Sequence, residues 1–161
     1  MFPIYIFTSL LVLTSVAATP NANETETAVN TTAWTGQGRI PVYAIGCWQD
    51  RIDDGEIAEA SRKLKDWGEN KLIRAGDWHG EEHSLAGVWV CNCKHFYNDH
   101  VVAWELDEAL ERLHDSCGKN QAGWVWSRKW QKRFNYGSAR FMKKKGLFTG
   151  KCPLFCLWSL R

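Results

Sequence analysis

Six cysteines constrain this chain more than any other feature of its sequence. They are Cys47, Cys91, Cys93, Cys117, Cys152 and Cys156. An even number of cysteines in a short chain indicates disulfide bonds if the protein enters an oxidising compartment. The spacings C-x-C and C-x3-C lie too far apart for a common zinc module, which disfavours the alternative of a metal site. The sequence therefore predicts a disulfide-stabilised fold and leaves the pairing open.

The N-terminal segment supports this interpretation. Residues 1–18 read MFPIYIFTSLLVLTSVAA and end in small residues, as a cleaved signal peptide does. Their apolar run is too short to span about 30 Å of hydrocarbon, so a membrane anchor is disfavoured. We therefore expect a secreted, extracellular protein, with translocation into a host cell as an open route, and no integral membrane segment.

The rest of the 161-residue chain divides into three parts. Residues 19–38 are polar and lack an apolar period, so they are predicted to be a disordered leader. The leader contains glycosylation sequons at Asn23 and Asn30. One folded α+β domain is expected at 39–142, and a basic, cysteine-containing extension at 143–161.

The hydrophobic pattern predicts the order of elements in the domain. Strands are expected at 40–48, 71–79, 87–94 and 123–131, and Phe134, Tyr136 and Phe141 can continue into a further strand. Helices are expected from Asp53 or Asp54 to Gly68 and over 102–117, because apolar residues recur there at helical spacing. The order β-α-β-β-α-β is that of a ferredoxin-like split β-α-β sandwich, with two helices on one face of an antiparallel sheet.

Charge is distributed unevenly along the chain. All 18 acidic residues precede Ser116, whereas 11 of the 20 Lys and Arg residues follow it. The C-terminal part interleaves these cations with aromatic residues, which favours an anionic partner such as a membrane surface or nucleic acid. The alternative is a solvated basic strand whose aromatic side chains face the core. The predicted basic patch comprises Arg128, Lys129, Lys132, Arg133, Lys143, Lys144 and Lys145.

One short motif raises the question of metal chemistry. His79, Glu82 and His83 spell H-x-x-E-H, which binds zinc when the two histidines lie one turn apart on a helix. Gly80 lies between them and costs a helix about 1 kcal/mol. We therefore expect a polar hairpin connection at 80–86, and no metal or other cofactor.

Secreted nuclease chemistry is the other enzymatic alternative. It requires two acid/base groups and a cation for the phosphate. The chain contains suitable residues, but nothing in their spacing assembles them, so no catalytic residue is predicted. The residues are Arg74, His79, Glu81, Glu82, His83, His95 and His100.

The segment 87–137 resembles a class of small secreted cysteine-rich proteins that includes effector candidates of plant-associated fungi. The resemblance rests on VWVCNC, ELDEALERLHDSCG, AGWVW and NYG. The inferred element order is also similar to the α/β sandwich of the viral killer toxins of smut fungi. This resemblance implies a non-enzymatic effector that binds a host protein or anionic surface and alters plant defence or cell death, and it implies no shared catalytic residues. A killer-toxin-like protein acting on competitor membranes, and a secreted ribonuclease or metal-dependent hydrolase, are the alternatives.

Overall fold

The computed structural model describes residues 27–29, 39–144 and 152. The expected signal peptide, the sequons at Asn23 and Asn30, Lys145 and Cys156 lie outside the described residues. The described part has an α+β fold. Its strands are β1 (Thr27–Val29), β2 (Ala44–Arg51), β3 (Leu72–Ile73), β4 (Trp78–His83), β5 (Ala86–Asn92), β6 (Asp99–His100), β7 (Gln121–Ser127) and β8 (Lys132–Ser138). Its helices are α1 (Asp54–Gly68), α2 (Ala103–Cys117) and α3 (Ala139–Lys143).

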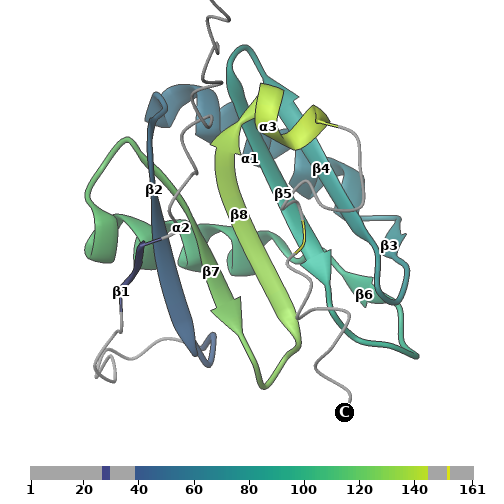
Figure 1. The fold of residues 1–161 in the computed structure, drawn as a ribbon. Coiled ribbons are helices and arrows are strands. Elements are labelled where there is room, and N and C mark those ends of the chain that lie inside the picture. Colours follow the sequence, from purple (N-terminus) through teal and green to yellow (C-terminus); the bar gives the residue numbers. More distant parts are fainter. Residues whose placement is uncertain (1–26, 30–38, 145–151, 153–161) are drawn as a thin grey trace, which may run out of the picture.

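One antiparallel sheet organises the molecule, with the strand order β1-β2-β7-β8-β5-β4. The short strands β3 and β6 form a separate pair at one side. Helices α1 and α2 lie behind the sheet in Figure 1, and α3 lies in front of it. The predicted α+β class, with an antiparallel sheet and disulfide bonds, is therefore confirmed.

The ferredoxin-like arrangement is not confirmed, because the strand order differs. The antiparallel pairs make β2 parallel to β4, which follows α1, and β5 parallel to β7, which follows α2. A ferredoxin-like sheet would place β2 beside β5, but β7 and β8 lie between these two strands. β8 takes a central position, paired with both β7 and β5, and its residues are buried almost throughout.

Both long helices form where the sequence predicts them. The side chain of Asp53 accepts hydrogen bonds from the backbone N–H groups of Gly55 and Glu56, so it caps α1 as expected. Gly118 follows α2 with a positive φ of 93°, a conformation that glycine adopts without steric cost. These local signals mark the start of α1 and the end of α2 in the sequence.

The second strand was predicted wrongly. The expected strand 71–79 is divided into β3 and β4, and most of the expected connection at 80–86 belongs to β4. Pairing between β4 and β5 continues to His83 opposite Ala86, so the turn itself contains only Ser84 and Leu85. Ser84 adopts a positive φ of 51°, as a tight hairpin turn requires. The long ladder with β5 overrides the poor strand propensity of Gly80 and the acidic residues.

The side of the sheet that faces α1 and α2 carries the main hydrophobic core. Ile57 and Leu64 of α1 and Leu106 and Leu113 of α2 are fully buried against the strands. Tyr136 of β8 reaches this core, and its hydroxyl donates to the carbonyl of Leu106 at 2.7 Å. Burial raises the pKa of the Tyr136 hydroxyl well above its usual value.

The opposite side of the sheet carries a second cluster that is rich in tryptophan. It contains Trp89, Trp124 and Trp126, and Phe141 and Met142 of α3 pack against it. Three strand glycines make room for the large rings, because a Cβ atom would lie 2.3 Å from Trp124 at Gly46, 2.6 Å from Trp48 at Gly137 and 2.5 Å from Trp89 at Gly80. The sheet is therefore covered on both faces, and β5, β7 and β8 are buried throughout or almost throughout.

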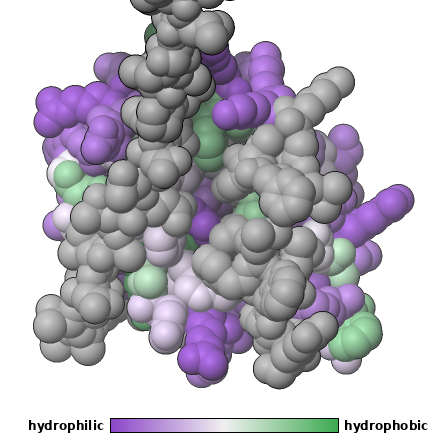
Figure 2. All heavy atoms as spheres, viewed as in Figure 1, coloured by the Kyte–Doolittle hydropathy of each residue, from purple (hydrophilic) through white to green (hydrophobic). Residues whose placement is uncertain are grey.

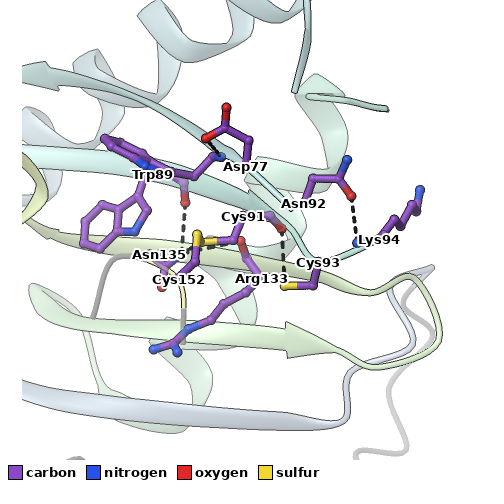
Figure 3. The surroundings of a disulfide bond; sticks show 10 residues. Asp77, Trp89, Cys91, Asn92, Cys93, Lys94, Arg133, Asn135 and Cys152 are labelled. Atoms are coloured by element: carbon purple, nitrogen blue, oxygen red, sulfur yellow. Dashed lines mark hydrogen bonds between the residues drawn. A yellow bond between two sulfur atoms is a disulfide. The ribbon is translucent and has the colours of Figure 1, made fainter. Parts of the chain in front are cut away.

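Disulfide bonds join separate parts of this structure. Cys47 of β2 is bonded to Cys117 at the end of α2, and Cys91 of β5 is bonded to Cys152 beyond α3. Figure 3 shows the second bond beside Trp89, Arg133 and Asn135. Cys93 is also disulfide-bonded, so every described cysteine is oxidised. Among the helices of the described residues, none has the length and apolar character needed to cross a bilayer.

Candidate functional site

The H-x-x-E-H residues lie on an edge strand, where they do not form one site. On β4, His79 and His83 share a face of the strand and Glu82 lies on the other face, because side chains alternate along a strand. His79 stacks on Trp67 of α1 with ring centroids 3.7 Å apart, and Glu82 pairs with Lys143 of α3 at 2.6 Å. The two faces thus contact different helices. The described residues contain no group of three or more His, Cys, Asp or Glu side chains placed to hold a metal ion.

The candidate acid/base residues fall in two places. His79 Nε2 lies 3.0 Å from Glu81 Oε1, and both side chains are about one third exposed. His100 belongs instead to β6, and His95 and Arg74 lie in the loops beside β6 and β3. The stacking of His79 on Trp67 makes this pair part of the contact between β4 and α1.

The structure does not bring the predicted basic patch together. Arg128 and Lys129 lie in the exposed turn between β7 and β8, whereas Lys143 ends α3 and Lys144 follows it, past the other end of β8. Lys132 and Arg133 are adjacent on β8, so their side chains point to opposite faces of the sheet, and both are buried. Arg133 lies over Trp124, with its guanidinium carbon 4.3 Å from the ring centroid.

A buried charge network surrounds Lys132. Its ammonium lies 2.7 Å from Glu105 Oε2 and 3.2 Å from Asp99 Oδ2, and it donates to the carbonyl oxygen of His100 at 2.9 Å. Lys94 pairs with the same Asp99 oxygen at 2.9 Å. Burial raises the pKa of Glu105, and the attraction of Lys132 only partly opposes this effect. The network joins β8, α2 and β6, and it leaves Lys132 unavailable to an external anion.

Three exposed apolar side chains lie on the segments around β3 and β6, whose backbones are held together by hydrogen bonds. Phe96 and Tyr97 are 83% and 72% exposed, and Leu72 is 44% exposed. We call these three residues the aromatic ridge. Figure 2 shows hydrophobic atoms at the lower right of the view, over the end where β6 lies in Figure 1.

The side chain of Asn92 holds the two segments of the aromatic ridge together. Its amide nitrogen lies 3.1 Å from the carbonyl oxygens of both Ile73 and Arg74 and 2.8 Å from that of Tyr97. Its amide oxygen accepts from the N–H of Lys94 at 3.1 Å. Asn92 itself is 1% exposed, so this hydrogen-bonding group is fixed within the core.

Sequence reasoning missed the aromatic ridge. The signal was the stretch His95-Phe96-Tyr97-Asn98, which places two aromatic residues in a polar connection between a strand and a helix. Aromatic residues in such a connection are buried in some proteins and exposed in others, so exposure required the tertiary structure.

Comparisons with known proteins do not assign this site. No protein-family model, no curated protein and no solved structure matches this chain.

Proposed function

We propose that the protein is a secreted, disulfide-stabilised effector of a plant-associated fungus, which acts by binding a host component and altering defence or cell death. The observation that carries this proposal is the complete oxidation of the described cysteines. Disulfide bonds persist in secreted proteins and are rare in the reducing cytosol. The signal-like segment 1–18 and the resemblance of 87–137 to small secreted fungal proteins point in the same direction.

The arrangement of the disulfides supports a binding role that depends on a rigid body. The Cys47–Cys117 bond ties β2 to the end of α2, and the Cys91–Cys152 bond ties β5 to Cys152 beyond α3. Such cross-links restrict the unfolded chain and stabilise a small domain outside the cell. A rigid, protease-resistant surface is what a binding protein needs in that environment.

Transient expression in leaves tests the proposal. One version carries residues 1–18 and the other begins at Thr19 behind an initiating Met, and cell death and suppression of a defence burst are scored. The version with residues 1–18 is expected to act, and Cys47→Ala/Cys117→Ala in that version is expected to reduce its effect. Silence from both versions despite detectable protein contradicts the proposal. Activity only without residues 1–18 places the target inside the host cell and contradicts a requirement for disulfides.

A further inference from the structure

We propose that the side chains of Lys63 and Asp77 keep the protein monomeric, because they block the outer edge of β4 against pairing with β4 of a second copy. Among the described residues, the sheet ends at β4 on one side and at β1 on the other. An edge strand presents backbone N–H and C=O groups that can pair with another chain. β1 has only three residues, whereas β4 has six, so β4 is the edge at greater risk. This inference goes beyond the proposed function and does not depend on it.

The pairing with β5 determines which backbone groups of β4 face outward. The N–H of Asn92 donates to the carbonyl oxygen of Asp77 at 2.9 Å, so these two opposite residues form a hydrogen-bonded pair. Hydrogen-bonded and non-hydrogen-bonded pairs alternate along an antiparallel ladder. His79 and Glu81 therefore also direct their backbone groups toward β5. The intervening residues, whose backbone groups point away from β5, are Trp78, Gly80 and Glu82.

Two side chains already bond to groups on this outer edge. Lys63 reaches the edge from α1, and its ammonium donates to the carbonyl oxygen of Glu82 at 2.8 Å. Asp77 Oδ1 accepts a hydrogen bond from the N–H of Trp78 at 2.8 Å. A turn positions Asp77, since its own N–H donates to the carbonyl of Arg74 at 3.1 Å. A lysine at an edge strand opposes the addition of another strand, because that strand would have to displace and bury the charge.

The two side chains block the same hydrogen bond of a symmetric dimer. When two copies pair antiparallel about a two-fold axis at Gly80, Glu82 of one copy lies opposite Trp78 of the other. One hydrogen bond of that pair runs from the N–H of Trp78 to the carbonyl oxygen of Glu82. Lys63 occupies this acceptor, and Asp77 occupies this donor. Because the axis repeats the pair, the dimer would lose this hydrogen bond twice.

Without the two side chains the edge would be complementary to itself. The same register places His79 opposite Glu81 of the second copy, and Asp77 opposite His83 of the second copy. Each of these pairs sets an imidazole beside a carboxylate, and the register sets no like charges directly opposite each other. Gly80 lies at the axis and has no side chain to obstruct the approach. A second copy of this chain is therefore the partner that Lys63 and Asp77 exclude.

The oligomeric state of substituted chains with their disulfide bonds formed tests this inference. Lys63→Met removes the ammonium from the edge, Asp77→Ala removes the carboxylate, and a double variant removes both. Lys65→Met is the matched control, because it removes the same charge from the same helix and Lys65 pairs with Asp107. Lys63→Arg is a second control that retains a charged donor. Light scattering after size-exclusion chromatography measures the molar mass at up to about 0.5 mM protein, where a dimer with a dissociation constant of about 100 µM is detected.

The wild type and both control variants are expected to remain monomers. The double variant is expected to have about twice their molar mass, and the two single variants are expected to dimerise more weakly. Amide hydrogen exchange then locates the contact. The N–H groups of Gly80 and Glu82 should exchange at least about tenfold more slowly in the dimer, whereas that of Glu81, which already faces β5, should not change.

Three results would overturn the inference. The first is a double variant that stays monomeric at the highest concentration, and the second is a wild type that already pairs through β4. The third is a dimer in which the amides of Gly80 and Glu82 exchange as fast as in the monomer, because that dimer forms through another surface. Melting temperatures establish that each variant is folded. Should Lys63→Met fail to fold, Asp77→Ala, an exposed change immediately before β4, decides the outcome alone.

Discussion

Glu105 and Glu108 lie one turn apart on α2, and the protein shifts their pKa values in opposite directions. Burial raises the pKa of Glu105 more than Lys132 lowers it. Burial also acts to raise the pKa of Glu108, but hydrogen bonds from the N–H groups of Ile40 and Arg39 and from Arg112 outweigh it, and the pKa falls. Protonation of these two neighbouring carboxylates therefore changes the stability of the protein in opposite directions.

The variant Glu105→Gln is expected to flatten the decrease in stability that accompanies rising pH. Because the folded-state pKa is raised, the native protein holds a proton that the unfolded chain has already released, and stability falls as pH rises through the folded-state value. Urea unfolding between about pH 4 and pH 7, the range just above an ordinary glutamate pKa, measures this slope. A variant that keeps the slope of the wild type would show that another group controls it.

The variant Glu108→Gln is expected to have the opposite effect on how the free energy of unfolding depends on acidic pH. The lowered pKa of Glu108 adds stability above the unfolded-state pKa, and this stability is lost as pH falls through the folded-state value. Without the carboxylate, the free energy of unfolding should decrease less between neutral and acidic pH. The same urea series serves as the measurement, and slopes that change in the same direction for both variants would contradict the assignment.

Lys132 and Lys143 are expected to respond very differently to substitution with Met. Lys132→Met removes the cation from buried Glu105 and Asp99 and should destabilise the protein by about 3–5 kcal/mol. Lys143→Met breaks an exposed pair with Glu82 and should cost less than about 1 kcal/mol. Chemical denaturation of the two variants gives both values. Equal effects would mean that Lys132 is solvated like a surface residue.

Gly46→Ala is expected to destabilise the protein by about 1–3 kcal/mol, as overpacking of a well-packed region does. A Cβ atom at position 46 would lie 2.3 Å from the Trp124 ring. The smaller ring of Trp124→Phe should relieve this clash, so the double variant should lose less than the sum of the single losses. A double-mutant cycle by thermal unfolding measures the coupling, and strict additivity would exclude contact between these positions.

Loss of the Cys47–Cys117 bond is expected to lower stability substantially. The two cysteines are 70 residues apart, and the chain-entropy relation predicts a loss of about 4 kcal/mol for a loop of that size. Cys47→Ala/Cys117→Ala tests this by denaturant unfolding under non-reducing conditions. Ser116→Ala, an exposed change beside Cys117, is the matched control. An unchanged unfolding midpoint in the double variant would contradict a structural role for the bond.

The helices could be predicted from the sequence because their signals are local. Asp53, the apolar residues at helical spacing and Gly118 lie within or beside the segments that they define. The strand order could not be predicted in this way. It depends on β8 pairing with both β5 and β7, and the pairs between β5 and β8 join residues that are 40 or more positions apart in the sequence. Pairing of that kind is a property of the whole sheet.

The candidate sites show the same limit of prediction from sequence. Alternation along a strand already implies that Lys132 and Arg133 point in opposite directions, but only the tertiary structure shows that both faces of β8 are covered. The H-x-x-E-H residues have the spacing of a helical motif, and the hairpin with β5 places them in a strand instead. The aromatic ridge depends on Asn92, whose three carbonyl partners come from two segments that are separate in the sequence.

The burial of the sheet on both faces also limits how this protein can diverge during evolution. All seven residues of β5 are buried, and β7 and β8 are buried almost throughout, so a substitution in these strands disturbs one core or the other. Substitutions are therefore expected to be tolerated mainly in the exposed loop of Phe96 and Tyr97 and in the turns. Lineages of this fold should retain a constant interior and diversify at its rim.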